Sequence, residues 1–184
     1  MRGAELSLAW SSLAAGLTRD TDIFARAATT WVRTARYAST RIATPPCFDG
    51  ATPGTPVETG RGAIPCGVAV DVNGNRLPYS PEWLANAALG LERGGFTAQV
   101  EVVGQTAMFA DDVNLVPVTP DGQRGRIPGW AEVNLAFSYG PPQGRWELFA
   151  TVKNIADRLI IVDRSRGILP GMPRLVQAGA KVKF

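Results

Sequence analysis

Histidine is absent from this chain of 184 residues. Its absence excludes Ser-His-Asp and Cys-His catalysis, together with metal sites that are built on imidazole ligands. No other catalytic constellation and no cofactor motif is found in the remaining residues. The sequence therefore predicts a protein that is not an enzyme and that needs no cofactor.

Long runs of apolar residues and runs of basic residues are also missing. No stretch of about 18 apolar residues occurs, so no membrane-spanning helix is expected. The net charge is +3, and no five or six basic residues stand together, so nucleic-acid binding is not expected. Mean hydropathy is close to zero. This value still allows transmembrane β-strands, because their alternating apolar and polar residues average out.

Only two cysteines are present, Cys47 and Cys66, in a segment rich in proline, glycine and threonine. Their spacing matches no zinc or redox motif. A disulfide, and hence an oxidising compartment, is the favoured interpretation, and two free thiols are the alternative. Closing a loop of about 20 residues would contribute ~3 kcal/mol in the chain-entropy description.

Alternation of apolar and polar residues with a period of two is the dominant pattern. It predicts seven strands by strict count, at about 3–15, 22–38, 77–92, 96–110, 129–140, 145–162 and 174–184. An eighth strand would have to come from a break inside 145–162 or from the long loop 39–76. Five prolines between 45 and 65 make regular structure unlikely in that loop. The N-terminal run is also read as a strand, because Glu5 interrupts it, and no export signal is found.

The links between these strands are short and long in turn. The short links are 16–20, 93–95 and 140–144, and the long loops are 39–76, 111–128 and 163–173. Aromatic residues gather at the strand ends on the apolar face. On the short-turn side they are Phe96, Phe137, Tyr139, Trp146 and Phe184, and on the long-loop side Trp31, Tyr37, Tyr79, Trp83 and Trp130. Both features favour an outer-membrane barrel over a soluble β-sandwich.

Five segments resemble TonB-dependent receptors of the Gram-negative outer membrane, in the order that the family has them. They are GAEL at 3–6, LPYSPE at 77–82, GRIPGW at 125–130 followed by Asn134-Leu135, VKNIADR at 152–158, and residues 166–184. The stretch 111–130 is most similar to receptors of the ferric citrate type. Each motif is weak by itself, but the ordered set covers nearly the whole chain.

This resemblance implies the C-terminal part of a receptor barrel over residues 1–184, with no plug domain. The fold class is then all-β, an antiparallel meander that forms part of a transmembrane barrel with about seven or eight strands. The family takes up ferric siderophores, cobalamin or other scarce nutrients across the outer membrane. The implied partners are outer-membrane lipid, the barrel assembly machinery, a ferric siderophore as ligand, and TonB only through the missing plug.

Several residues are candidates for function within this interpretation. Phe184 resembles the terminal aromatic residue that the assembly machinery recognises, and it would also serve as a lipid-facing girdle residue. An anionic ferric chelate would meet charged residues of the long loops, each of which is otherwise a solvated loop charge: Asp111, Asp112, Arg126, Arg164 and Arg166. Asp111 and Asp112 stand beside Asn114 and allow a cation site, but a solvated loop is favoured because no glycine-anchored calcium-loop spacing accompanies them. Asn154 and Asp157 are predicted to be turn or bulge residues.

Three classes of protein remain open from the sequence. The first is a transporter fragment, comprising the last strands of a receptor. The second is a small stand-alone structural barrel of eight strands in the outer membrane. The third is a soluble β-sandwich that acts as a binding module.

Overall fold

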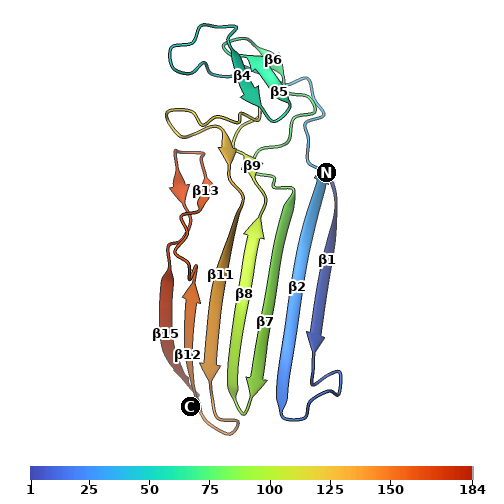
Figure 1. The fold of residues 1–184 in the computed structure, drawn as a ribbon, viewed down its shortest axis with the longest axis vertical. Coiled ribbons are helices and arrows are strands. Elements are labelled where there is room, and N and C mark those ends of the chain that lie inside the picture. The colour runs from blue at the N-terminus through green and yellow to red at the C-terminus, as the bar shows by residue number, and fades with distance from the viewer. Residues whose placement is uncertain (184) are drawn as a thin grey trace.

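The computed structural model describes residues 1–183. Its main element is an antiparallel sheet of seven strands, in which each strand pairs with the next long strand along the chain (Figure 1). These strands are β1 (Arg2–Ser11), β2 (Thr21–Thr34), β7 (Trp83–Arg93), β8 (Phe96–Gln105), β11 (Trp130–Tyr139), β12 (Trp146–Lys153) and β15 (Leu175–Val182). The predicted all-β, antiparallel meander is confirmed.

The sheet is open. β1 and β15 form its two edges, and no ladder joins them within residues 1–183. An eighth strand of this sheet does not occur in the described part of the chain. The same residues include no helix of the length and apolar character that crossing a membrane requires.

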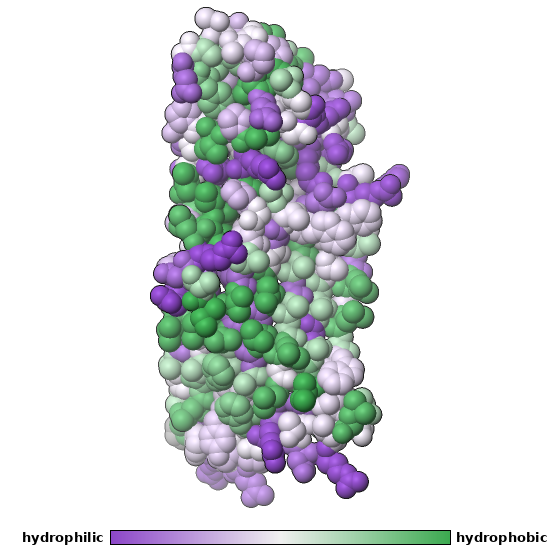
Figure 2. All heavy atoms as spheres, viewed as in Figure 1, coloured by the Kyte–Doolittle hydropathy of each residue, from purple (hydrophilic) through white to green (hydrophobic). Residues whose placement is uncertain are grey.

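Each face of the sheet has its own chemistry, because residues directly opposite one another project to the same side. One row across all seven strands is apolar, and its members are Trp10, Ala25, Leu89, Val100, Leu135, Val152 and Val176. The neighbouring row points to the other side and holds Ser11, Phe24, Gly90, Gln99, Ala136, Thr151 and Gln177. Many large side chains of the apolar face are exposed, and Figure 2 shows them as an apolar band over the lower half of the molecule.

On the polar face, two phenylalanine rings cover glycines of the next strand. A Cβ at Gly90 would lie 2.3 Å from Cζ of Phe24, and one at Gly179 would lie 2.5 Å from Cζ of Phe149. Phe24 is only 8% exposed as a result. Glycine at these positions thus provides the space in which the ring packs against the neighbouring strand.

The aromatic residues follow the predicted girdles only in part. Tyr139 and Trp146 form an edge-to-face pair at the short-turn end, with ring centroids 5.7 Å apart. Trp31 and Trp83 stack at the long-loop end, 5.6 Å apart. Trp130, however, lies opposite Gln105 and therefore faces the polar side. Tyr37 and Tyr79 lie in the long loops, outside the sheet.

Several predicted strands are too long at the loop end. The strand predicted at 77–92 begins at Trp83, because Tyr79 takes a positive φ of 54°. The strand predicted at 145–162 ends at Lys153, because Asn154 turns the chain with a φ of 48°. A left-handed residue cannot continue a β-strand, and apolar alternation gives no sign of it.

The long loops contain strands of their own, so the prediction of no regular structure in 39–76 is wrong. Four two-stranded sheets join β3 (Ile42–Ala43) to β6 (Val70–Asp71), β4 (Pro56–Thr59) to β5 (Gly62–Pro65), β9 (Met108–Phe109) to β10 (Arg126–Ile127), and β13 (Ile161–Asp163) to β14 (Leu169–Pro170). Pro56 lies opposite Pro65 at the open end of its hairpin. Proline is tolerated there because a terminal ladder position needs no N–H donor.

Phe184 lies outside the described residues. Its predicted role as an assembly signal stays a prediction.

Candidate functional site

The three long loops meet in a structure above the sheet that we call the cap, comprising residues 35–82, 106–129 and 154–174 (Figure 1). The cap has a small apolar core of its own. Its buried members are Val57, Cys66, Val72, Val113 and Leu115. Backbone hydrogen bonds between Gly60 and Asn114 and between Val116 and Glu58 join the first loop to the second. The first two loops therefore pack as one unit.

The predicted disulfide is present. Cys47 and Cys66 are bonded, with their Cα atoms 4.9 Å apart, and Cys66 is 2% exposed inside the cap core. The bridge closes the tip of the first loop, next to the contact with Val57 and Val72.

Replacing both cysteines with serine is expected to destabilise the cap by about 3 kcal/mol, as for a loop of this length. Hydrogen exchange would locate the change. The amide of Cys66, which donates to Thr55, and that of Gly67, which donates to Pro45, should lose protection, while amides of β7 and β8 keep theirs. Equal loss in the sheet would contradict a local role for the bridge.

Asn114 connects the first two loops through its side chain. Its carboxamide accepts from the N–H of Arg76 at 2.7 Å and donates to the carbonyl of Arg76 at 2.8 Å. The residue is 2% exposed and has a φ of 59°. Sequence reasoning treated Asn114 only as a neighbour of two carboxylates, although asparagine's tolerance of positive φ was an available signal.

Asp111 is buried rather than exposed at the loop surface. It is 6% exposed, and its carboxylate accepts from the N–H of Leu115 at 3.1 Å and that of Gly125 at 2.9 Å. Asp112 is separate from it and forms an ion pair with Arg41, at 2.9 Å. No group of three metal-ligating side chains occurs among the residues that the structure describes. The solvated-loop interpretation is thus wrong for Asp111, which closes the second loop.

Burial raises the pKa of the Asp111 carboxyl above its ordinary 3.8, outweighing the two backbone donors that lower it. A raised pKa means that the folded cap binds this proton more tightly than the unfolded chain does. Asp111 therefore favours the folded cap at acidic pH, and this contribution falls as the pH rises from the ordinary value through the raised one.

Exchange protection of the Leu115 and Gly125 amides, corrected for intrinsic rates, should fall over that pH window in the wild-type protein. The variant Asp111→Asn, which cannot ionise, should not show this pH-dependent fall in exchange protection. The same pH dependence in both proteins would show that another group causes it.

Arg164 is also buried rather than loop-exposed. It is 3% exposed, and its Nη1 donates to the carbonyl of Gly122 at 3.1 Å. Its backbone N–H donates to the hydroxyl of Tyr79 at 3.3 Å, and the N–H of Tyr79 donates to Phe109 at 2.8 Å. Tyr79 and Arg164 therefore connect all three loops, and only Arg126 and Arg166 of the predicted arginines remain exposed.

The polar face provides a second group of candidate residues. In its upper half, the amide of Asn134 lies 3.2 Å from a carboxylate oxygen of Glu101 and 3.4 Å from one of Glu132. Its carbonyl oxygen accepts from the N–H of Asn154 at 3.0 Å. The amide thus holds two carboxylates of neighbouring strands on one side of the sheet.

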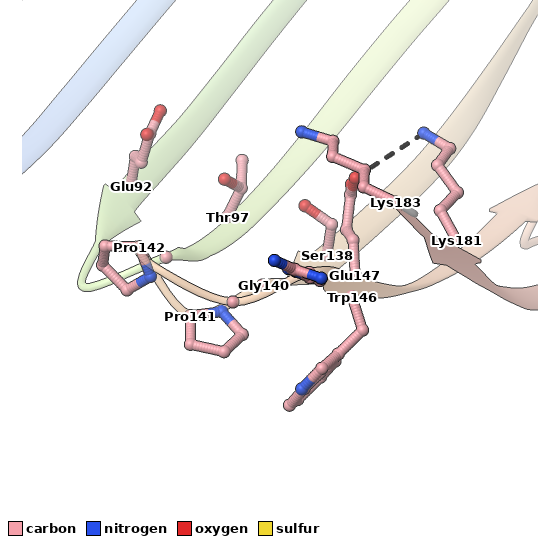
Figure 3. Close-up of a pocket in the computed structure, with 13 residues that line it drawn as sticks. Glu92, Thr97, Ser138, Gly140, Pro141, Pro142, Trp146, Glu147, Lys181 and Lys183 are labelled. Carbon is pink, nitrogen blue, oxygen red and sulfur yellow. Dashed lines mark ion pairs between the residues drawn. The ribbon is translucent and has the colours of Figure 1, made fainter.

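At the short-turn end, the polar face is hollowed into a charged groove of about 310 Å³. Figure 3 shows Glu92, Glu147, Lys181 and Lys183 on the groove side of the strands, while Trp146 points away from it. One ion pair, Lys181 to Glu147 at 3.7 Å, joins the neighbouring strands β15 and β12 beside the groove. The arrangement suits polar or charged contacts, and it offers no nucleophile paired with a base.

Comparison with known proteins identifies a family model, and the similar solved structures include two receptors. Residues 1–155 match the family model described as "TonB dependent receptor-like, beta-barrel". The structure of the ferric citrate transporter FecA in the unliganded form is similar, with a TM-score of 0.67 and 23% identity, over 99% of this chain and 24% of that one. The siderophore receptor PiuA from Acinetobacter baumannii is similar with a TM-score of 0.61 and 16% identity, over 97% and 21%. The chain thus spans about a quarter of the length of the receptors that it resembles.

Proposed function

Since the chain belongs to the TonB-dependent receptor-like β-barrel family, whose members are outer-membrane transporters rather than enzymes, we propose that it forms part of a receptor barrel for uptake of a ferric siderophore or a similar nutrient. The observation that carries this proposal is the sheet itself. One face is apolar and exposed between two aromatic pairs, and the other is polar, as a lipid-facing wall with an aqueous lumen requires.

The two open edges of the sheet support the proposal that it forms part of a larger barrel rather than a complete one. An edge strand in lipid leaves N–H and C=O groups without partners, which costs several kcal/mol for each group. We propose that further receptor strands pair with β1 and β15. In such a receptor the polar face meets the plug, and TonB acts through that plug.

A small stand-alone barrel made of these strands is the second candidate. It would have to pair β1 with β15, and with seven strands in sequence these two run in the same direction. Closure would then need a parallel pair in an otherwise antiparallel barrel, whereas bacterial single-chain barrels have an even number of strands. The observed strand number disfavours this candidate.

Deleting the coding segment for these residues in the producing bacterium tests the proposed function. Growth should fail on at least one ferric siderophore of a panel supplied as the sole iron source, and recover with free iron. Unchanged growth on every member would contradict it. Purification of the 184-residue chain by itself tests the second candidate, because a closed small barrel would migrate heat-modifiably in detergent and an open sheet would aggregate.

Arg126 and Arg166 are the two predicted loop arginines that remain exposed, and we propose that they contact an anionic ferric chelate. Replacing both with glutamine should weaken binding by about tenfold, which corresponds to ~1.4 kcal/mol. Arg124→Gln, a change at another exposed arginine of the cap, is the matched control. Equal affinity in the double variant and the wild-type receptor, measured by titration with the siderophore identified above, would exclude the contact.

A further inference from the structure

Two exposed arginines, Arg158 and Arg174, lie at the loop end of the sheet, where β12 and β15 meet the cap. Arg174 is two residues before Val176, a member of the apolar row, and Arg158 contacts β11 at Ala131. On the β12–β15 side of Figure 2, a hydrophilic cluster separates apolar side chains above it from the apolar band below. Charge thus appears at the boundary of the proposed lipid-facing surface.

Both guanidinium groups are held in place by backbone carbonyl groups. Nη1 of Arg158 donates to Ala131 at 3.1 Å, and Nη1 of Arg174 donates to Ile155 at 3.4 Å. The amide of Asn154 donates to the carbonyls of Arg158 and Met172, at 2.9 and 3.0 Å, and so ties the two segments together. Because a guanidinium group has five N–H donors, most donors of both groups are left for a ligand.

The positive charge of this pair is only partly neutralised. Asp157 lies 3.8 Å from Nη2 of Arg174, and both side chains are about half exposed, at 51% and 52%. Such an exposed, long ion pair is weak. Within residues 1–183, Arg158 has no carboxylate oxygen within 4.0 Å of its guanidinium nitrogens. The pair therefore attracts anions.

Exposed apolar side chains lie close to these arginines along the chain. Leu159 is 86% exposed, Met172 is 55% exposed and Ile155 is 38% exposed. Apolar side chains interleaved with arginine suit the level of a bilayer where headgroups meet acyl chains, because the arginine reaches the phosphate while the apolar groups stay in hydrocarbon. A soluble inorganic anion would use the arginines and leave these apolar groups in water.

We propose that Arg158, Arg174, Leu159 and Met172 form a binding site for an anionic lipid in the leaflet on the loop side, with the guanidinium groups binding its phosphate-bearing headgroup. Guanidinium groups match phosphate oxygens in a bidentate geometry, which a point charge cannot do. The inference rests on the proposed function, since it needs the apolar face to lie in a membrane.

The test uses the whole receptor that carries this chain, reconstituted in vesicles of equal phosphatidylglycerol and phosphatidylcholine. The receptor is then extracted with mild detergent, and native mass spectrometry measures the lipids that it retains. The wild-type receptor should retain phosphatidylglycerol preferentially. Arg158→Gln combined with Arg174→Gln should lower this preference about tenfold, each single change less, and Arg124→Gln should leave it unchanged.

Equal retention of the two lipids by the wild-type receptor would overturn the site, as would the same loss in the Arg124→Gln control. Displacement of phosphatidylglycerol by millimolar inorganic phosphate would show a soluble anion site instead of a lipid site. Failure of the receptor to enter these mixed vesicles would contradict the proposed function itself, so failure of the lipid site and failure of the proposed function can be distinguished.

Discussion

Asn154→Ala is expected to destabilise the end of the sheet at β12 and β15 by about 3–5 kcal/mol. The side chain is 1% exposed and makes three hydrogen bonds, two to carbonyl oxygens and one from the N–H of Arg158 at 3.0 Å. Alanine would leave three backbone groups without partners, and each such group costs about 1–3 kcal/mol when it is buried. Equilibrium unfolding of the receptor in urea, in detergent micelles, would measure the loss.

Two further variants separate the causes at Asn154. Glycine accepts the positive φ of 48° without strain, so Asn154→Gly should lose only the hydrogen bonds and be about 1 kcal/mol more stable than the alanine variant. Asn154→Asp keeps the acceptor for Arg158 and loses both donors. Asn73→Ala, at an exposed asparagine whose side chain makes no hydrogen bond within the described residues, is the matched control. Equal stability of the alanine and control variants would refute this role.

Gly90→Val is expected to destabilise the sheet by more than about 3 kcal/mol. The new Cβ would lie 2.3 Å from Cζ of Phe24 and 2.7 Å from the carbonyl oxygen of Ala98. The ring can move, but the carbonyl belongs to β8, so the pairing of β7 with β8 must shift. Overpacking that displaces backbone exceeds the usual cost of about 1–3 kcal/mol for an inserted side chain.

The double variant Phe24→Ala with Gly90→Val tests which contact dominates. Removing the ring should recover only part of the stability, because the contact with Ala98 remains. Ala87→Val, an exposed substitution on the apolar face of the same strand, should change the midpoint of urea unfolding little. Full recovery of stability in the double variant would show that the clash with the Phe24 ring alone excludes a larger side chain at position 90.

The sheet was largely predictable. Period-two alternation is a local property, and it identified all seven strands and most of the residues on each face. Trp130 departs from the predicted girdle, because the alternation of its strand places it opposite Gln105 on the polar face. The strand ends were missed where Tyr79 and Asn154 take positive φ, a property that hydropathy does not encode.

The candidate site was predictable only in outline. The sequence predicts five charged residues of the long loops either as ligand contacts or as solvated charges, and the structure buries Asp111 and Arg164 inside the cap. Their partners, Gly125 and Gly122, lie 14 and 42 residues away along the chain. Loop charge alone does not show which of these side chains the loops will enclose.

Local alternation, residue counts and ordered short motifs are enough to predict the seven long strands, the two faces of the sheet, the favoured disulfide and the family. They do not show that three distant loops pack into one cap, that Asp111 and Arg164 are buried inside it, or that Arg158 and Arg174 remain exposed close to apolar side chains. The difference lies in the range of the interactions. Alternation acts between neighbouring residues, whereas burial of a loop charge depends on hydrogen-bond partners that the fold brings from elsewhere in the chain.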